Sequence, residues 1–136
     1  MKKIIFITVL IFACSTTFGQ DKKTDEVVEK WKNYFNKEDY KSAYDLYSQA
    51  YQQKSSLSNL TRSMKDVYGM MGKLKSIKFI SYKDYVYKYI FYAKANQIEA
   101  DVSIVVNKDG QLGYLNFDSI GGTGDPPPMA PRDKNR

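Results

Sequence analysis

Histidine is absent from this sequence, and its one cysteine, Cys14, stands close to the start. Histidine is the commonest general base and metal-binding side chain, so its absence excludes Ser-His and Cys-His nucleophile pairs within the chain. Zinc and copper sites are built mainly from histidine and cysteine, and an internal disulfide needs two cysteines. We therefore expect a protein that is not an enzyme, with no catalytic residues, no metal site and no cofactor.

Arginine is scarce, and lysine supplies most of the positive charge behind the formal net charge of +6 at pH 7. Proteins that bind nucleic acid usually gather arginine on one face, which this sequence does not do. The glycine-rich stretch "GGTG" precedes prolines instead of a helix, so it lacks the helix N-terminus that binds phosphate. We expect no nucleic-acid partner and a solvated, lysine-rich surface.

Residues 1–19 have the pattern of a signal peptide. Two lysines precede the apolar run Ile4–Ala13, which is shorter than the about 20 residues that span a bilayer but suits a signal-peptide core. Signal peptidase would cut after Gly19, whereas a lipoprotein peptidase would cut before Cys14. Both routes export the chain, so we expect a periplasmic or secreted protein. The alternative is a lipoprotein that reaches the membrane only through a lipid on Cys14.

Apolar residues recur at helical spacing in three runs between Thr24 and Gly72. The first run begins at Thr24, and the second covers Tyr40–Tyr51. The third begins near Ser58, a good N-cap residue, and ends at Gly72, where glycine allows a left-handed cap. The pattern predicts three N-terminal helices.

After Gly72 the pattern changes to the alternation typical of strands. "LKSIKFISY" and "DYVYKYIFYAKA" are rich in β-favouring residues, Ile98–Val106 alternates between apolar and polar, and "QLGYLNFDSI" follows a hairpin turn at Asn107–Gly110. The class is therefore α+β, with three N-terminal helices packed on one face of a curved, four-stranded antiparallel sheet. We expect one domain over residues 20–120 and a disordered Gly/Pro-rich tail over residues 121–136.

Tyrosine is abundant, with twelve copies. In "YKDYVYKYIFYAKA", Tyr85, Tyr87 and Tyr89 alternate onto one face of the predicted strand. This face suits a thin core, because a tyrosine ring can be buried while its hydroxyl reaches the rim. The alternative is a tyrosine-lined pocket or an exposed stacking platform. The candidate lining residues of such a pocket are Trp31, Tyr34, Tyr85, Tyr87 and Tyr89.

Glu99 and Asp101 lie two apart on a predicted strand, so both point to the same face, about 7 Å apart. Paired glycosidase carboxylates are separated by a similar distance, but they stand in a cleft. Here the opposite face of the strand is the apolar one. We therefore predict that both carboxylates lie on a solvated outer face, near Lys78, Lys83 or Lys88.

Four packing motifs extend over Thr24–Phe117: "WKNYF", "NKEDYKSAYDLYSQAY", "LSNLTRSMKDVYGMMGKLKSIKF" and "VSIVVNKDGQLGYLNF". In these the chain resembles small exported bacterial domains of unknown function with the nuclear transport factor two-like (cystatin-related) fold. The resemblance implies a cone, in which a curved sheet wraps helices and leaves a pocket at the wide mouth. Enzymes of that superfamily place Asp, His or Tyr in the pocket, and this chain has no His to match.

The function that we expect is that of an exported, non-catalytic accessory or binding domain. Its aromatic-lined pocket would bind a small apolar or aromatic ligand or a protein partner. One alternative is a structural module of the cell envelope that forms a homodimer through its sheet, with Val86, Ile90 and Tyr92 on the outer face. The other is an enzyme that uses Tyr, Asp or Glu as acid and base, which requires a carboxylate such as Glu99 or Asp101 to turn inward.

Overall fold

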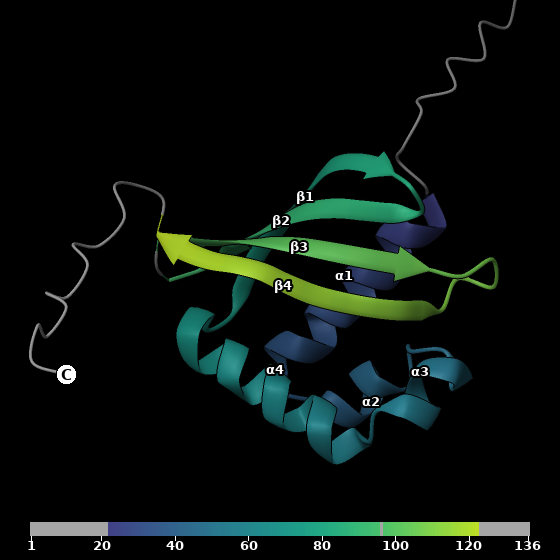
Figure 1. Ribbon diagram of the computed structural model, residues 1–136. Coiled ribbons are helices and arrows are strands. Elements are labelled where there is room, and N and C mark those ends of the chain that lie inside the picture. The colour runs from purple at the N-terminus through teal and green to yellow at the C-terminus, as the bar shows by residue number, and fades with distance from the viewer. Residues whose placement is uncertain (1–21, 96, 123–136) are drawn as a thin grey trace, which may run out of the picture.

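The computed structural model describes residues 22–95 and 97–122, in which four helices precede four strands (Figure 1). The signal peptide predicted for residues 1–19, and residues 123–136 of the predicted tail, lie outside the described residues. The helices are α1 (Lys22–Asn36), α2 (Tyr40–Tyr44), α3 (Gln49–Lys54) and α4 (Leu57–Met71). The strands are β1 (Leu74–Lys83), β2 (Val86–Ala93), β3 (Ile98–Val106) and β4 (Leu112–Gly122).

The strands form one antiparallel meander in the order β1-β2-β3-β4, so that β1 and β4 are the two edges. Figure 1 shows the helices gathered on one side of this sheet. This arrangement confirms the predicted α+β class and the four-stranded antiparallel sheet. Among the described residues, no helix combines the length and the hydropathy needed to cross a membrane.

The cross-strand register divides the sheet into an inner face against the helices and an outer face. On the inner face, Tyr89 pairs with Phe79 and Val102, and both Tyr89 and Val102 are buried. Alternate residues of each strand share a face, so the buried ones follow the period of two that the sequence predicted. The buried apolar residues of the sheet are Leu74, Tyr89, Phe91, Ala93, Ala100, Val102, Ile104 and Leu112.

Trp31, on α1, joins the helical layer to the sheet. Its ring stacks on Phe35 of the same helix with centroids 5.0 Å apart, and it lies 5.9 Å from both Phe91 and Phe117. The indole is 1% exposed. Full burial of so large a ring contributes several kcal/mol, on the order of 3–5 by comparison with truncation to alanine.

The prediction of one continuous helix over Tyr40–Tyr51 is wrong, because the structure has two short helices there, α2 and α3. The intervening segment pairs with β4 instead: Leu112 N donates to Leu46 O at 2.9 Å, and Ser48 N donates to Leu112 O at 2.8 Å. Tyr47, between them, forms an isolated bridge with Leu112. Backbone groups that bond the sheet edge cannot also continue a helix, and the Ser48 hydroxyl caps the new helix by accepting from Tyr51 N.

The ends of α4 differ slightly from the expectation. Ser56, and not the region of Ser58, supplies the N-cap, with its hydroxyl accepting from Asn59 N. Gly72 ends the helix as predicted: its φ is +67°, and its N–H donates to Tyr68 O. A positive φ strains any residue with a Cβ, which explains glycine at this position.

Asn36 fastens the end of α1 to the start of β1. Its amide Nδ2 donates to Leu74 O at 2.9 Å, and its Oδ1 accepts from Leu74 N at 2.7 Å. The two residues are 38 positions apart in the sequence. One side chain therefore satisfies both backbone groups of an edge-strand residue that is itself buried.

Replacing Asn36 with alanine should lower the free energy of unfolding by about 1–3 kcal/mol, because two backbone groups lose their partners. The urea midpoint measures this, with an unchanged m-value. Asn33→Ala, an exposed asparagine on the same helix, is the control and should change stability by less than about 0.5 kcal/mol. Equal midpoints for Asn36→Ala and Asn33→Ala would contradict the role of Asn36.

Candidate functional site

The five residues predicted to line a pocket do not come together. Trp31 and Tyr89 are core residues, at 1% and 2% exposure. Tyr34 and Tyr87 are half-buried, and the Tyr87 ring packs on Tyr82 with centroids 4.5 Å apart. The helices thus cover most of the inner aromatic face. Of the two alternatives that the sequence left open, the tyrosines of this face mainly form a core and not an open pocket.

Tyr85 is not on the inner face, so its predicted position is wrong. Lys83 pairs directly with Val86, which leaves Asp84 and Tyr85 as a two-residue turn with φ of 53° and 66°. Two successive positive φ values are the mark of the hairpin turn that suits twisted strands. The tyrosine ring is 80% exposed at the tip of this hairpin. The alternation seen in the sequence therefore stops at Val86.

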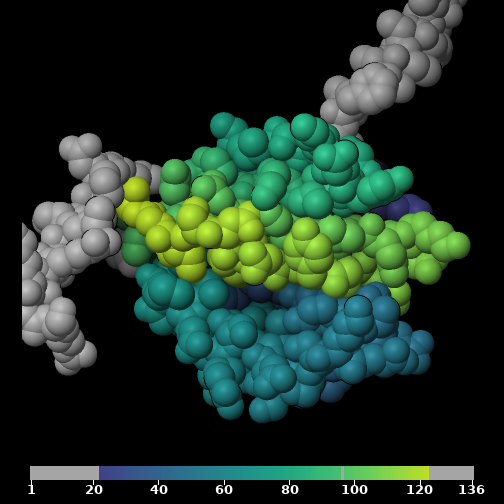
Figure 2. Space-filling view, in the orientation of Figure 1, coloured from purple at the N-terminus to yellow at the C-terminus, as the bar shows by residue number. Residues whose placement is uncertain are grey.

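Between β4 and α4 the covering is incomplete. Figure 2 shows a hollow between the yellow-green β4 and the teal helical layer below it. A cavity of about 40 Å³ lies here, with Trp31 in its wall. We call it the β4–α4 groove, lined by Trp31, Tyr47, Leu60, Ser63, Met64, Val67, Leu115 and Phe117.

Each wall of the groove has a structural cause. Leu115 and Phe117 are inner-face residues of an edge strand, and each is only partly buried. Ser63 is an exposed residue at the mouth on α4. Met70, 51% exposed, follows Ser63 by about two helical turns and lies on the same flank of α4. An apolar strip therefore continues along the helix from the cavity.

Trp31, in the wall of the groove, has an indole nitrogen without a hydrogen-bond partner. Among the described residues, the buried side-chain atoms without a hydrogen-bond partner are Thr24 Oγ1, Trp31 Nε1 and Tyr40 OH. Of these three residues, Trp31 alone lines the groove. A buried donor without an acceptor costs about 1–3 kcal/mol.

Tyr47 lies beside this indole. Burial raises the pKa of Tyr47 far above its ordinary value, and the neighbouring Tyr51 raises it further. Trp31 lies near enough to the Tyr47 hydroxyl to lower that pKa a little, although no acceptor meets the geometry of a hydrogen bond with Nε1. The phenol is therefore neutral at every physiological pH and is unsuited to act as a base.

The backbone edge of β4 runs along the groove. β4 has a strand neighbour on one side only, and its Leu112 bonds Leu46 and Ser48 on the other. Within the described residues, no other β4 residue makes a backbone hydrogen bond to a helix or loop. The register is regular from Tyr114 to Phe117, between two shifts. This regular stretch contains both β4 residues of the groove.

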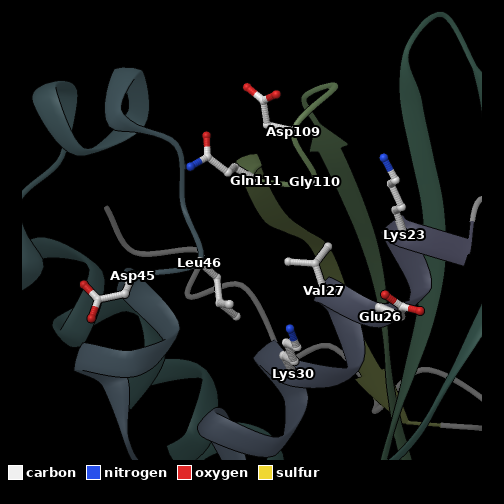
Figure 3. Close-up of a pocket in the computed structure, with 9 residues that line it drawn as sticks. All are labelled: Lys23, Glu26, Val27, Lys30, Asp45, Leu46, Asp109, Gly110 and Gln111. Carbon is white, nitrogen blue, oxygen red and sulfur yellow. The ribbon is translucent and has the colours of Figure 1, made fainter.

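A larger hollow lies between α1, the end of α2 and the β3–β4 turn (Figure 3). Its volume is about 370 Å³, within the range of small-molecule sites. Val27 and Leu46 lie among side chains of both charges (Figure 3). These walls are not the aromatic lining that the sequence predicted. The charged and amide residues are Lys23, Glu26, Lys30, Asp45, Asp109 and Gln111.

The outer face carries a polar cluster around Asp118. Lys88 Nζ lies 2.9 Å from Asp118 Oδ2, and Asn116 Nδ2 donates to Asp118 Oδ1 at 2.8 Å. Ser103, only 5% exposed, donates to the same carboxylate and accepts from Lys88. Partial burial raises the pKa of Asp118, but the hydrogen bonds from Ser103, Lys88 and Asn116 outweigh it and hold the pKa below 3.8. The cluster is satisfied internally, which marks it as structural.

The predicted pair of carboxylates also lies on the outer face. Asp101 pairs with Ile90 and Ser119 and accepts from the Ser119 hydroxyl at 2.7 Å, and Glu99 pairs with Tyr92. Neither faces the helices. The carboxylate that does pair with Lys88 is Asp118, which the sequence pattern did not single out.

No metal-binding group of three or more His, Cys, Asp or Glu side chains occurs in residues 22–95 and 97–122. A search of family models, curated proteins and solved structures finds no match to this chain. The described geometry therefore carries the functional interpretation by itself.

Asp118 should make stability depend on pH. A carboxylate whose folded pKa is lowered contributes stability above its ordinary value of 3.8, and that contribution is lost as pH falls through the folded pKa. Asp118→Asn should thus be less stable than wild type at pH 7, with the difference narrowing below pH 3.8 in urea titrations. Asp66→Asn on α4 makes the same change in net charge away from the cluster and serves as the control. A constant difference between pH 7 and pH 2 for Asp118→Asn would contradict the assignment.

Proposed function

We propose that this protein is an exported, non-catalytic accessory domain that binds a protein partner by taking one apolar side chain of that partner into the β4–α4 groove. The observation that carries the proposal is the unsatisfied Nε1 of Trp31, a residue in the largely apolar wall of a groove that exposed Ser63 also lines. An apolar side chain of the partner would pack against the apolar wall, and a neighbouring carbonyl oxygen of the partner would accept a hydrogen bond from the indole N–H.

The size of the groove favours a side chain over a free small molecule. Its volume of about 40 Å³ holds a water molecule or the end of an aliphatic side chain. Ligand pockets usually measure about 300–1,000 Å³. Interfaces, in contrast, commonly have small apolar pockets that receive one anchor residue from the partner.

The arrangement of carboxylates also supports a binding role. Glu99 and Asp101 lie on the outer face, away from the groove. Asp25, on α1, accepts from the Tyr89 hydroxyl at 2.6 Å, but neither residue lines the groove. An acid–base site would need such a pair at a surface that a substrate reaches. The helical layer over one face of an antiparallel sheet is also consistent with the proposed nuclear transport factor two-like fold.

Binding in the groove should be visible through Trp31, the only tryptophan of the chain. N-acetyl-leucinamide supplies one apolar side chain flanked by carbonyl oxygens. It should shift the indole N–H resonance in a saturable way at millimolar concentrations, together with the amide resonances of Leu115 and Phe117. Ser63→Phe, which fills the mouth of the groove, should abolish the shift.

Ser58→Phe is the matched control, because Ser58 is exposed on a different face of α4. It should bind like the wild type. An indole resonance that stays fixed up to the solubility limit of the probe, or that shifts equally in Ser63→Phe, would overturn the proposed function.

A second candidate function, pairing of two copies through the outer face, is favoured by the distribution of charge on the sheet. β1 and β2 carry only lysines among their charged residues, whereas β3 and β4 carry only carboxylates. A twofold axis parallel to the strands, between β2 and β3, would place each basic half on an acidic half. The residues are Lys75, Lys78, Lys83 and Lys88 on one half, and Glu99, Asp101 and Asp118 on the other.

This face would form a weak dimer. Four strands about 4.8 Å apart, each about nine residues long, cover roughly 500–600 Å² per copy, below the about 800 Å² of a standard interface. Light scattering should show a dimer at high protein concentration and low salt that dissociates as salt screens the charges. Lys78→Glu should lower the dimer fraction, and Lys54→Glu on α3 should not. A monomer at every concentration would remove this candidate.

A further inference from the structure

The β4 edge and the β4–α4 groove are parts of one surface. From Tyr114 to Phe117 the strand is regular, and along this stretch its outer backbone edge faces no helix or loop to which it is hydrogen-bonded. Leu115 and Phe117, from the same four residues, form one wall of the groove. A chain that paired with this edge would lie about 4.8 Å from β4, directly over the opening beside α4.

We propose that the partner binds as an added strand: an extended segment of another protein pairs with Tyr114–Phe117 of β4 and places alternate apolar side chains in the β4–α4 groove. This inference rests on the proposed function and deepens it by naming the partner's conformation and sequence pattern. Main-chain hydrogen bonds supply affinity in this mode, and pockets for alternate side chains supply specificity.

The inner side of the added strand would meet an apolar surface. One side chain enters the cavity beside Trp31, between Leu115 and Val67. The next inward side chain, two residues along, lies about 7 Å away and faces the flank of α4 that carries exposed Met70.

The outer side of the added strand would meet acidic charge. β3 and β4 carry Glu99, Asp101 and Asp118 and no basic residue. Lys88 of β2 pairs with Asp118, so Glu99 and Asp101 supply the remaining negative charge on this half of the sheet. Asp101 pairs with Ser119 and Glu99 pairs with Gly121, so the two carboxylates lie two strand spacings, about 10 Å, from the part of the new strand that extends past Phe117. This distance is close to a Debye length at physiological salt. Charge complementarity therefore favours lysine or arginine at the outward positions. The segment that fits alternates apolar and basic residues.

The test uses the full exported domain and an acetylated, amidated hexapeptide, Lys-Ile-Lys-Leu-Lys-Ile, with Lys-Lys-Lys-Ile-Leu-Ile as a control of the same composition. The alternating peptide should shift the indole N–H of Trp31 and the amide resonances of Tyr114–Phe117, and it should bind about tenfold or more tightly than the control. Replacing its lysines with glutamate should weaken binding at low salt.

Two N-methylated forms of the peptide separate strand addition from simple insertion. Each carries methyl groups on one alternate set of backbone nitrogens. In an added strand only one set points at β4, so one form should lose about tenfold or more in affinity while the other binds like the parent. Ser63→Phe should weaken binding of the parent peptide, and Ser58→Phe should not.

Each other outcome overturns the inference in a distinct way. Equal binding by both N-methylated forms would mean insertion without strand pairing. If N-acetyl-leucinamide binds but the alternating peptide binds no more tightly than the control peptide, the proposed function is supported and the added-strand proposal is wrong. Failure of both probes would remove both proposals. Shifts of Tyr114–Phe117 that depend on protein concentration alone would make a second copy of this chain the occupant.

Discussion

The packing of Trp31 is the interaction on which the arrangement of the two layers depends. One ring, on the first helix, contacts Phe35 beside it and Phe91 and Phe117 on two strands of the sheet. In a domain that has no disulfide within its described residues, such a contact must hold helix and sheet together without a covalent link, mainly by burying apolar surface. The same ring is the wall of the groove, so the centre of the core and the candidate binding surface share a residue. A change at Trp31 would confound stability with binding, which makes the groove mouth the better place to probe function.

The break between α2 and α3 determines how much of β4 remains open. Leu46 and Ser48 bond Leu112 and close the start of the strand, while α4 passes below the rest without bonding it. Had Tyr40–Tyr51 continued as one helix, this local closure would be absent and Tyr47 would not reach the sheet. The backbone bridge between Tyr47 and Leu112 thus bounds the groove at one end. The side chain of Tyr47 also forms part of the groove wall.

Most of the architecture could be predicted from residue patterns, and the errors have physical causes. Periodicity identified the strands because each has one buried face, and Gly72 identified the end of α4 because only glycine adopts its φ without strain. Periodicity did not show that Tyr85 is in a turn, since a tyrosine at positive φ looks in the sequence like one more alternating residue. It did not show the break at Tyr47 either, because long-range pairing with Leu112 outweighed a local helical pattern.

The candidate site was harder to predict than the fold. Trp31 was identified from its place on the first helix, but Ser63, Leu115 and Phe117 come together only through the way that α4 crosses the sheet edge. In the sequence, the strand alternation around Leu115 and Phe117 and the helical spacing around Ser63 look the same as the patterns of ordinary packed elements. Whether such residues are fully covered depends on the relative position of two elements, which a local pattern does not contain. The polar cluster around Asp118 depends in the same way on a register shift in β4.

The two register shifts in β4 have a consequence for how the protein avoids aggregation. They lie between Val105 and Val106 and between Asp101 and Val102 on the partner strand, opposite the ends of the regular stretch Tyr114–Phe117. Irregularities of this kind twist an edge and stop long flat pairing between chains, which is the first step toward fibres. The shifts leave β4 with two regular stretches of four residues, Tyr114–Phe117 and Ser119–Gly122. A stretch of that length is long enough for a brief, reversible contact and too short to template an indefinitely growing sheet.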